Sequence, residues 1–402
     1  MGFLNISAKF DGIQSDFLVD KLEEEENSGK VKLEVGQMFN TIHHFRQVLR
    51  EAKNQVLNKT DKEHIQSYNK LYSYGYVVRQ RNPGSMVLLR TVTPTLGGLK
   101  LFQRLFISFE AQKSGFLKGC RPFLGLDGCH IKGSYSGMLL SAIAIDANNG
   151  VYPVALCVCE GESKESWCWF LELLRKHIGT EDRRKITFMS DRQKGVKAAL
   201  DTYWPDSSSR YCVRHIIANM HARFKGDLNG IYVWDAANCT NRADFQVEMN
   251  KLHDVCPAAY EYMMGIPLKH WCVHAFDLHV KSAHTTNNVT EAFNSWVDDY
   301  RSMPALLLVE SIRRNVMKLI HERYQKALKW TSRVTPMVMN KLAERQEKAR
   351  YVTVLCASEH EFEVKDGCKF CIVNLNTHSC DCGLWEVRLV KQMEVLRGKK
   401  IR

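Results

Sequence analysis

The sequence predicts an α/β protein whose central part is a mixed β-sheet covered by helices. Two observations carry this prediction: three short apolar runs lie between residues 123 and 160, and the residues that follow, up to about 225, alternate between helical and strand patterns. With 402 residues, of which 45% are hydrophobic and 25% charged, the chain is long enough for one large domain or two to three smaller ones.

The three apolar runs are FLGLDGCHI, MLLSAIAIDA and VYPVALCVCE, separated by Gly-Ser and Asn-Asn-Gly turn signals. They predict three consecutive antiparallel strands. Ser163 then fits the N-cap of a helix, with Ser166 at the third helical position. Apolar residues follow with the spacing i, i+3, i+4, i+7, at Trp167, Phe170, Leu171 and Leu174. This spacing predicts an amphipathic helix.

The alternation continues beyond this helix. ITFMS predicts a fourth strand, residues 194–203 a helix, and RYCVRH a fifth strand that runs into the helix HIIANMHARF. The order β-β-β-α-β-α-β-α, three antiparallel strands followed by α/β alternation, is the layout of the ribonuclease-H-like fold.

The flanking segments have weaker patterns. Residues 37–57 and 61–80 have helical spacing, and the segment between residues 225 and 283 reads as helices rich in Trp, Tyr, Met and His. Val289, Phe293 and Trp296 form one helical stripe, so Glu291 on the other side can face a site. The predicted organisation is a loosely ordered leader (1–35), an N-terminal helical segment (36–119), the first part of the core (120–225), a helical insertion (226–283), the end of the core with Glu291 (284–330), and a helical and β-rich tail (331–402).

The charge balance indicates a polyanionic partner. The chain has 56 Lys and Arg against 44 Asp and Glu, a formal charge of +12, which favours nucleic acid. We expect no membrane partner, because there is no apolar run of about 18 residues and no signal-peptide pattern. The 14 cysteines are expected to be reduced, buried or metal-related, in the cytosol or nucleus.

Three separated acids are the strongest candidates for chemistry: Asp127, Asp191 and Glu291. Three carboxylates brought together by folding can hold two divalent metal ions about 3.5–4 Å apart, which suits cleavage of phosphodiesters. The alternative is that acids at strand ends are ordinary solvated residues. Spacing alone therefore leaves the function open.

The segment LDGCHIKGSYSGMLLSAIAIDANNGVYPVALCVCEGESKESWCWFLELL, followed by ITFMSDRQKG, RYCVRHIIANM and TTNNVTEAFNSW, closely resembles plant Mutator-like element (MULE) transposases of the MuDR type over residues 110 to 330. The resemblance implies that Asp127, Asp191 and Glu291 form a DDE site in a ribonuclease-H-like core. It also implies two Mg²⁺ or Mn²⁺ ions, strand cleavage and transfer on double-stranded DNA, a homo-oligomer when active, and the nucleus.

The resemblance further implies a role near the active site for Cys212 and His215, which match a Cys-x-x-His motif. Taken alone, this pair is half a zinc site, and a buried cysteine beside a satisfied histidine is the alternative. Four basic residues follow the two aspartates and are candidates for DNA phosphate contacts, with solvated surface as the alternative. They are His130, Lys132, Arg192 and Lys194.

The chain departs from the family at two zinc-binding parts. The family's DNA-recognition finger should fall between Met38 and Leu71, yet no cysteine precedes Cys120. Cys380 and Cys382 match the first two ligands of a SWIM zinc finger, but no Cys or His follows them. Two ligands cannot close a tetrahedral zinc site, and the nearby Cys368, Cys371 and His378 are substitutes only by proximity in sequence. We therefore expect an incomplete Zn²⁺ site and no autonomous transposition.

Three functional hypotheses fit the sequence. The first is a transposase-derived protein whose DDE core cleaves and joins DNA with divalent metal. The second is a noncatalytic DNA-binding transcriptional regulator, like the related far-red-response regulators. The third is a decayed element copy.

Overall fold

The computed structural model describes residues 42–387 except 94–97, 99, 133–135, 180–184, 278–279, 281 and 368. The chain divides into two compact units, Met1–Gln66 and Ser67–Arg402, and helix α1 (Ile42–Arg81) contributes to both. The sequence predicted two helices there, whereas the structure has a single continuous helix. The predicted leader, residues 1–35, lies outside the described residues.

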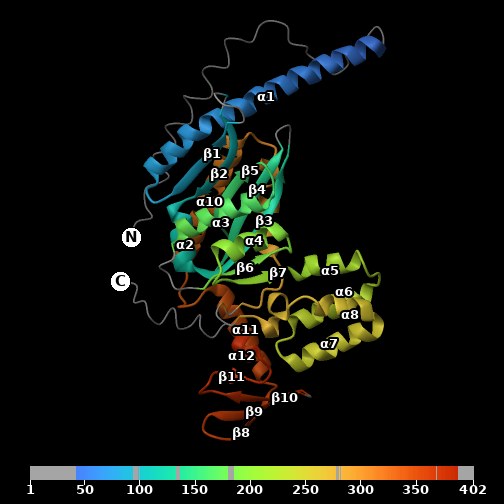
Figure 1. The fold of residues 1–402 in the computed structure, drawn as a ribbon. Helices are drawn as coiled ribbons and strands as arrows, with labels where there is room; N and C mark the ends of the chain where they lie inside the picture. Colours follow the sequence, from blue (N-terminus) through green and yellow to red (C-terminus); the bar gives the residue numbers. More distant parts are fainter. Residues whose placement is uncertain are drawn as a thin grey trace. The chain divides into compact units, whose positions relative to one another are not determined.

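A seven-stranded mixed sheet is the centre of the second unit, in the order β1-β2-β5-β4-β3-β6-β7 (Figure 1). Its strands are β1 (Met86–Val92), β2 (Leu101–Ser108), β3 (Cys120–Ile131), β4 (Gly137–Asp146), β5 (Val151–Cys159), β6 (Thr187–Ser190) and β7 (Ser208–Tyr211). The pairs β3–β6 and β6–β7 are parallel and the others antiparallel. The mixed sheet and the three consecutive antiparallel strands predicted from the sequence are confirmed.

Strands β1 and β2 correct the prediction that residues 36–119 are helical. They extend the sheet beside β5, and only α2 (Glu110–Gly119) follows as a helix. Arg104 interrupts the apolar pattern of β2, yet it is buried in the sheet. Its guanidinium pairs with Glu160 and donates to the carbonyl of Glu165 over 2.8 Å, which satisfies the buried charge.

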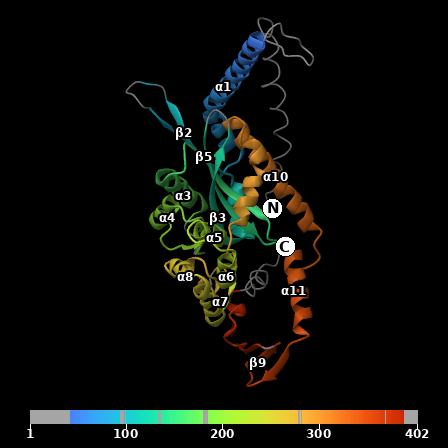
Figure 2. The same ribbon diagram turned by 90° about the vertical axis from the view of Figure 1, so that its right-hand side faces the viewer.

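Helices cover both faces of the sheet. Alternate residues of β2 point to opposite sides: Phe106 packs with α3 (Lys164–Ile178), and Leu105 with α10 (Ala305–Leu328). Figure 2 shows α3 and α4 (Lys194–Tyr203) on one side of the strands and α10 on the other. The Ser163 side chain accepts a hydrogen bond from the amide of Ser166, so the predicted N-cap of α3 is confirmed. The predicted apolar stripe of α3 packs within the core.

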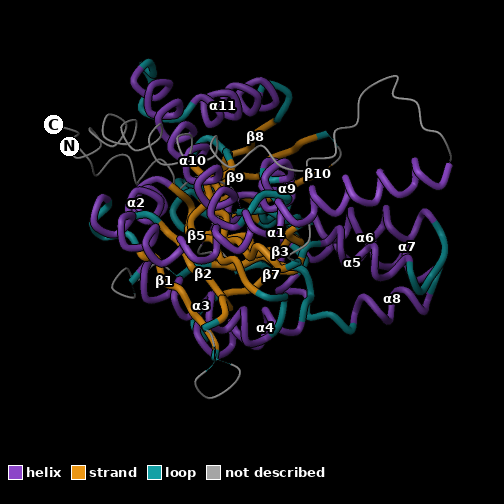
Figure 3. The backbone as a smooth tube through the Cα atoms, turned by 90° about the horizontal axis from the view of Figure 1, so that it is seen from above, coloured by secondary structure: helices purple, strands orange, loops and turns teal. Residues whose placement is uncertain are grey.

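The helices predicted for residues 226–283 are present, and one more helix, which the sequence predicts as part of the core, precedes them. After β7 come α5 (Val213–His221), α6 (Asp227–Asn238), α7 (Arg242–Val255) and α8 (Pro257–Met264), then the 3₁₀ turns η2 (Leu268–His270) and η3 (Val273–Ala275). Helices α5 to α8 project together to one side in Figure 3. They have a hydrophobic core of their own, which includes Phe245, Met249 and Trp271.

The end of the chain returns to the sheet and then leaves it. Helix α9 (Asn288–Trp296) and the turn η5 (Asp298–Tyr300) precede α10, and α11 (Pro336–Ala349) follows. A separate four-stranded sheet comprises β8 (Thr353–Cys356), β9 (Glu361–Asp366), β10 (Lys369–Asn374) and β11 (Ser379–Cys380), before α12 (Leu384–Val387). The helices and β pattern expected after residue 303 are therefore confirmed. None of the described helices is both long and apolar enough to cross a membrane.

Candidate active site

Asp127 and Asp191 lie beside each other in the interior of the large sheet, at the carboxyl end of β6. Strands β3 and β6 are parallel neighbours, and their last registered pair joins Gly125 to Met189. Each aspartate is two residues beyond this pair, and adjacent strands are about 4.8 Å apart. The structure thus brings together the first two acids of the predicted trio.

Asp127 is half-buried, and two hydrogen bonds hold its carboxylate. The backbone amide of Gly128 donates to Oδ1 and the side-chain amide of Asn294 donates to Oδ2, each over 2.9 Å. Burial raises the pKa of Asp127 above its usual value, and the negative charge of Asp191 raises it further, although the hydrogen bond from Gly128 opposes them. The two carboxylates therefore interact electrostatically.

Helix α9, which carries Glu291, approaches β3 closely because residue 125 is glycine. A Cβ atom at Gly125 would lie 2.5 Å from Asn287 Oδ1, so a side chain there would push the helix away. The side-chain amide nitrogen of Asn287 donates to the carbonyl of Leu126 over 3.1 Å, and Phe293 is fully buried. These contacts fix the start of α9 next to Asp127.

Glu291 itself is directed at Arg214 of α5. The two side chains form an ion pair, with 54% of the arginine side chain and 37% of the glutamate side chain exposed. Asn294, one turn further along α9, is the residue that contacts Asp127. The structure therefore does not bring the third acid of the trio together with the two aspartates.

Cys212 and His215 form a hydrogen-bonded pair at the start of α5. The sequence predicts Cys212 on the fifth strand, but β7 ends at Tyr211 and Cys212 is the N-cap residue of α5. Its sulfur accepts a hydrogen bond from the backbone amide of Asn287 over 3.4 Å. This bond connects α5 to the segment before α9. The hydrogen bond with Cys212 raises the pKa of His215 to about 8, and the charges of the two aspartates raise it too, against the effect of partial burial. Cys212 thus has a structural role, while His215 lies within electrostatic reach of the acids.

Glu162 is an acid near the aspartates that the sequence analysis missed. Its carboxylate accepts a hydrogen bond from Trp167 Nε1 over 3.1 Å, and a Cβ at Gly128 would lie 3.4 Å from its carboxyl carbon. Burial raises the pKa of Glu162, and the charges of Asp191 and Asp127 raise it as well. Strands β3, β5 and β6 run in the same direction. Glu162 and Asp191 follow the carboxyl ends of β5 and β6, and Asp127 lies within β3 beside the end of β6. That position was the available signal.

The four basic candidates differ in their contacts. Lys132 Nζ pairs with Asp298 Oδ2 at 2.9 Å, and Arg301 binds the same carboxylate. His130 is exposed at the end of β3 and Lys194 is exposed at the start of α4. Arg192 is exposed and donates to the hydroxyl of a tyrosine in α8.

The cysteines of the expected SWIM motif are close to each other. The sulfur atoms of Cys380 and Cys382 are 3.0 Å apart. Cys371 lies on β10, and Cys368 is outside the described residues. Throughout the part of the chain that the structure describes, no group of three or more His, Cys, Asp or Glu side chains could hold a metal ion. Cys371 forms a side-chain hydrogen bond with Cys382, and Zn²⁺ binding at these cysteines stays a prediction.

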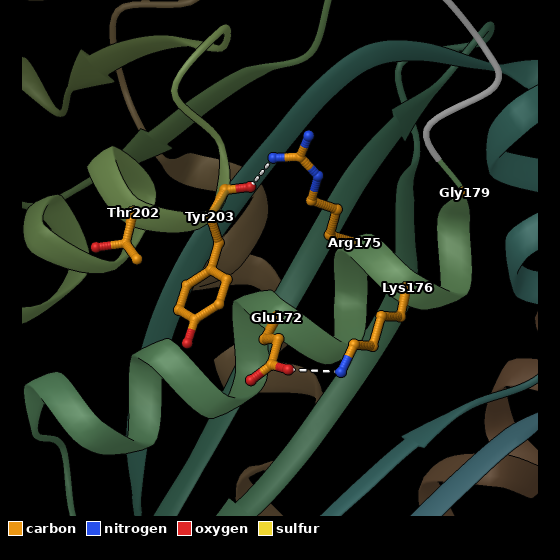
Figure 4. Close-up of a pocket in the computed structure, with 6 residues that line it drawn as sticks. All are labelled: Glu172, Arg175, Lys176, Gly179, Thr202 and Tyr203. Carbon is orange, nitrogen blue, oxygen red and sulfur yellow. Dashed lines mark hydrogen bonds and ion pairs between the residues drawn. The ribbon is translucent and has the colours of Figure 1, made fainter.

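A surface pocket lies away from the acids. Figure 4 shows its lining, which comprises Glu172, Arg175, Lys176, Gly179, Thr202 and Tyr203. The pocket joins the carboxyl ends of α3 and α4, whereas Asp191 precedes the other end of α4, roughly 15 Å away for a ten-residue helix. Lys176 and Glu172 pair with each other, and Arg175 donates to the carbonyl of Tyr203. We assign no chemistry to this pocket.

The carboxylates of Asp127 and Asp191 fit two of the ligands that a divalent cation needs. Aspartate oxygens are suitable ligands for Mg²⁺ or Mn²⁺, and Asp127 and Asp191 are neighbours. Glu291 is engaged by Arg214, so a three-carboxylate group is not formed in this arrangement. Residues that could complete the set from nearby are Glu162 and, after release from Arg214, Glu291.

Comparison with known proteins gives a family-model match in the core. No curated protein matches the chain. A family model described as the MULE transposase domain matches residues 123–219, a range that includes Asp127, Glu162, Asp191, Cys212 and His215. This match supports a Mutator-like transposase family for the chain.

Proposed function

We propose that this chain is a transposase-derived DNA-binding protein whose core cleaves and transfers DNA strands with divalent metal. The observation that carries the proposal is the neighbouring placement of Asp127 on β3 and Asp191 at the end of the parallel strand β6, inside the segment that matches the MULE transposase domain. The order β5-β4-β3-β6-β7, with three antiparallel strands followed by two parallel ones, supports a ribonuclease-H-like core.

The residues divide into distinct roles. Asp127 and Asp191 would hold Mg²⁺ or Mn²⁺, which when bound supplies positive charge to the leaving oxygen and activates the attacking hydroxyl or water. Asn294 and the amide of Gly128 orient Asp127. Glu291 completes the acid set once Arg214 no longer binds it. His215, with its raised pKa, adds positive charge near the acids at neutral pH.

Double-stranded DNA is the proposed substrate, the nucleus the proposed compartment, and a homo-oligomer the proposed active form. The net charge of +12 supports the partner, because phosphate neutralisation dominates affinity for DNA.

The test is cleavage of end-labelled duplex DNA by the full chain with Mn²⁺ or Mg²⁺. Asp127→Asn and Asp191→Asn should each abolish metal-dependent cleavage while the melting temperature is kept or raised. Asp201→Asn is the matched control, because Asp201 is an exposed aspartate on α4. Cleavage that persists in both site variants would overturn the proposal, and binding without any metal-dependent cleavage would favour a noncatalytic DNA-binding protein.

A further inference from the structure

Two arginines and two tyrosines form a joint surface between the sheet and the helical insertion. We call this the arginine–tyrosine surface: Arg192, Tyr211, Arg223 and Tyr262. Arg192 directly follows Asp191, Tyr211 ends β7, Arg223 follows α5, and Tyr262 lies on α8. The surface therefore begins next to the candidate site and continues onto the insertion.

The tyrosines hold both guanidinium groups. Arg192 Nη1 donates to the Tyr262 hydroxyl over 3.1 Å, and the Arg192 guanidinium carbon is 5.9 Å from the centre of the Tyr211 ring. The Arg223 guanidinium carbon is 5.0 Å from the centre of the Tyr262 ring. Such cation–π contacts fix a guanidinium in place without neutralising its charge.

The tyrosine rings are supported from behind. Tyr211 stacks on His270 with ring centres 4.7 Å apart, and the His270 Nδ1 atom lies 2.7 Å from the carbonyl oxygen of Ser209. Phe224 packs against Tyr262 with ring centres 5.9 Å apart. The rings are thus held by the core and the insertion, and they present the arginines in a set geometry.

No acid neutralises these arginines within the described residues. Arg192 and Arg223 are both exposed, and neither forms an ion pair with a described carboxylate. In contrast, Lys132 and Arg214, which are also near the site, each bind a carboxylate. Two exposed guanidinium groups with fixed orientation and unmatched charge fit phosphate oxygens, which they can bind through paired hydrogen bonds.

We propose that the arginine–tyrosine surface binds neighbouring phosphates of a DNA strand and guides that strand past Asp191. This rests on the proposed function, because it takes the same DNA as its partner. It goes further by assigning phosphate contacts to Arg192 and Arg223, and by giving the helical insertion a part in DNA binding, because its Tyr262 holds both guanidinium groups. Tyr262 is a positioning residue here, since it acts through Arg192.

The test is binding of labelled duplex DNA to the full chain without divalent metal, by fluorescence anisotropy between about 50 and 200 mM KCl. Each phosphate contact contributes about 0.9 to the slope of log K against log salt concentration. Arg192→Gln and Arg223→Gln should each weaken binding and lower this slope by about that amount. Arg242→Gln, at an exposed arginine of the same insertion, should leave the slope unchanged.

A double-mutant cycle tests the positioning role. Tyr262→Phe keeps the ring but removes the hydroxyl that binds Arg192, so it should weaken DNA binding in the wild type and have little effect in Arg192→Gln. Additive effects of the two changes would contradict the positioning role. Lysine at 192 and 223 provides a second set of variants if the glutamine variants melt early. Lysine keeps the charge and the salt slope but loses the paired hydrogen bonds, so affinity alone should fall.

The outcomes separate this inference from the proposed function. Salt-sensitive DNA binding with unchanged slopes in both arginine variants would overturn the inference, because the surface would then only join the insertion to the core. The proposed DNA function would stand in that case. If the wild-type chain binds no DNA, both are overturned.

Discussion

Replacing Arg214 by glutamine should increase the affinity of the site for Mn²⁺. In the structure Arg214 binds Glu291 and so competes with any ion that needs this carboxylate. Both side chains are substantially exposed, 54% for the arginine and 37% for the glutamate. Ion pairs with this exposure contribute about 0.2–1 kcal/mol. Because 1.4 kcal/mol corresponds to a factor of ten, release of Glu291 should lower the Kd for Mn²⁺ by a factor of roughly 1.4 to 5.

The assay is calorimetric titration of Mn²⁺ into the protein without DNA, supported by the Mn²⁺-dependent rise in melting temperature. Arg350→Gln is the matched control, because Arg350, the C-cap residue of α11, forms an exposed ion pair with Glu347 at 2.9 Å. Arg214→Lys keeps the charge and should bind Mn²⁺ nearly as weakly as the wild type.

A second background distinguishes release of Glu291 from a general effect of charge. Removing any cation near the aspartates could favour a metal ion, so Arg214→Gln should be compared with and without Glu291→Gln. If Arg214 acts through Glu291, its replacement has little effect once residue 291 is glutamine. A Kd that is unchanged in Arg214→Gln, or that falls equally in both backgrounds, refutes the reasoning.

Three further predictions concern stability. The folded-state pKa of Asp127 is raised, so its ionisation costs stability as the pH rises above the unfolded-state pKa. Asp127→Asn should therefore have a higher melting temperature than the wild type at pH 7, and this difference should vanish below about pH 4. The folded-state pKa of His215 is raised to about 8, so its contribution to stability is complete below about pH 6.5 and is lost as the pH rises through 8. The stability difference between the wild type and His215→Gln, measured by urea unfolding, should shrink over that pH range. Gly125→Ala places a Cβ 2.5 Å from the buried Asn287 side chain, and overpacking of this kind costs about 1–3 kcal/mol, which denaturant unfolding would detect; an unchanged midpoint would contradict the close packing of α9.

The sequence predicts the elements around the aspartates because their patterns are local. The stripe that includes Trp167 and Phe170 defines α3, and the alternating runs define β3, β4 and β5. Strands β1 and β2 were missed because their pattern is not purely local. Arg104 breaks the apolar run of β2, and only its long-range pair with Glu160 makes its burial tolerable.

In the candidate site, too, the sequence predicts what depends on local patterns and misses what depends on long-range contacts. The neighbouring positions of Asp127 and Asp191 follow from the strand order, which the element sequence already implies. The environment of Glu291 does not, since it depends on a contact between side chains 77 positions apart. Helical periodicity places Glu291 on the outer face of α9 but cannot choose between Arg214 and the aspartates as its partner.

The free-energy difference between the two partners of Glu291, Arg214 and the aspartates with a bound ion, is small, and this affects how the structure relates to activity. The contacts that fix α9 are buried: Phe293 is fully enclosed and Asn287 is 2% exposed. The contact that directs Glu291 is an exposed ion pair of at most about 1 kcal/mol. The backbone of the site is therefore rigid, while its third carboxylate can change partner at low cost. A bound cation with even modest preference for Glu291 would be sufficient to redirect it.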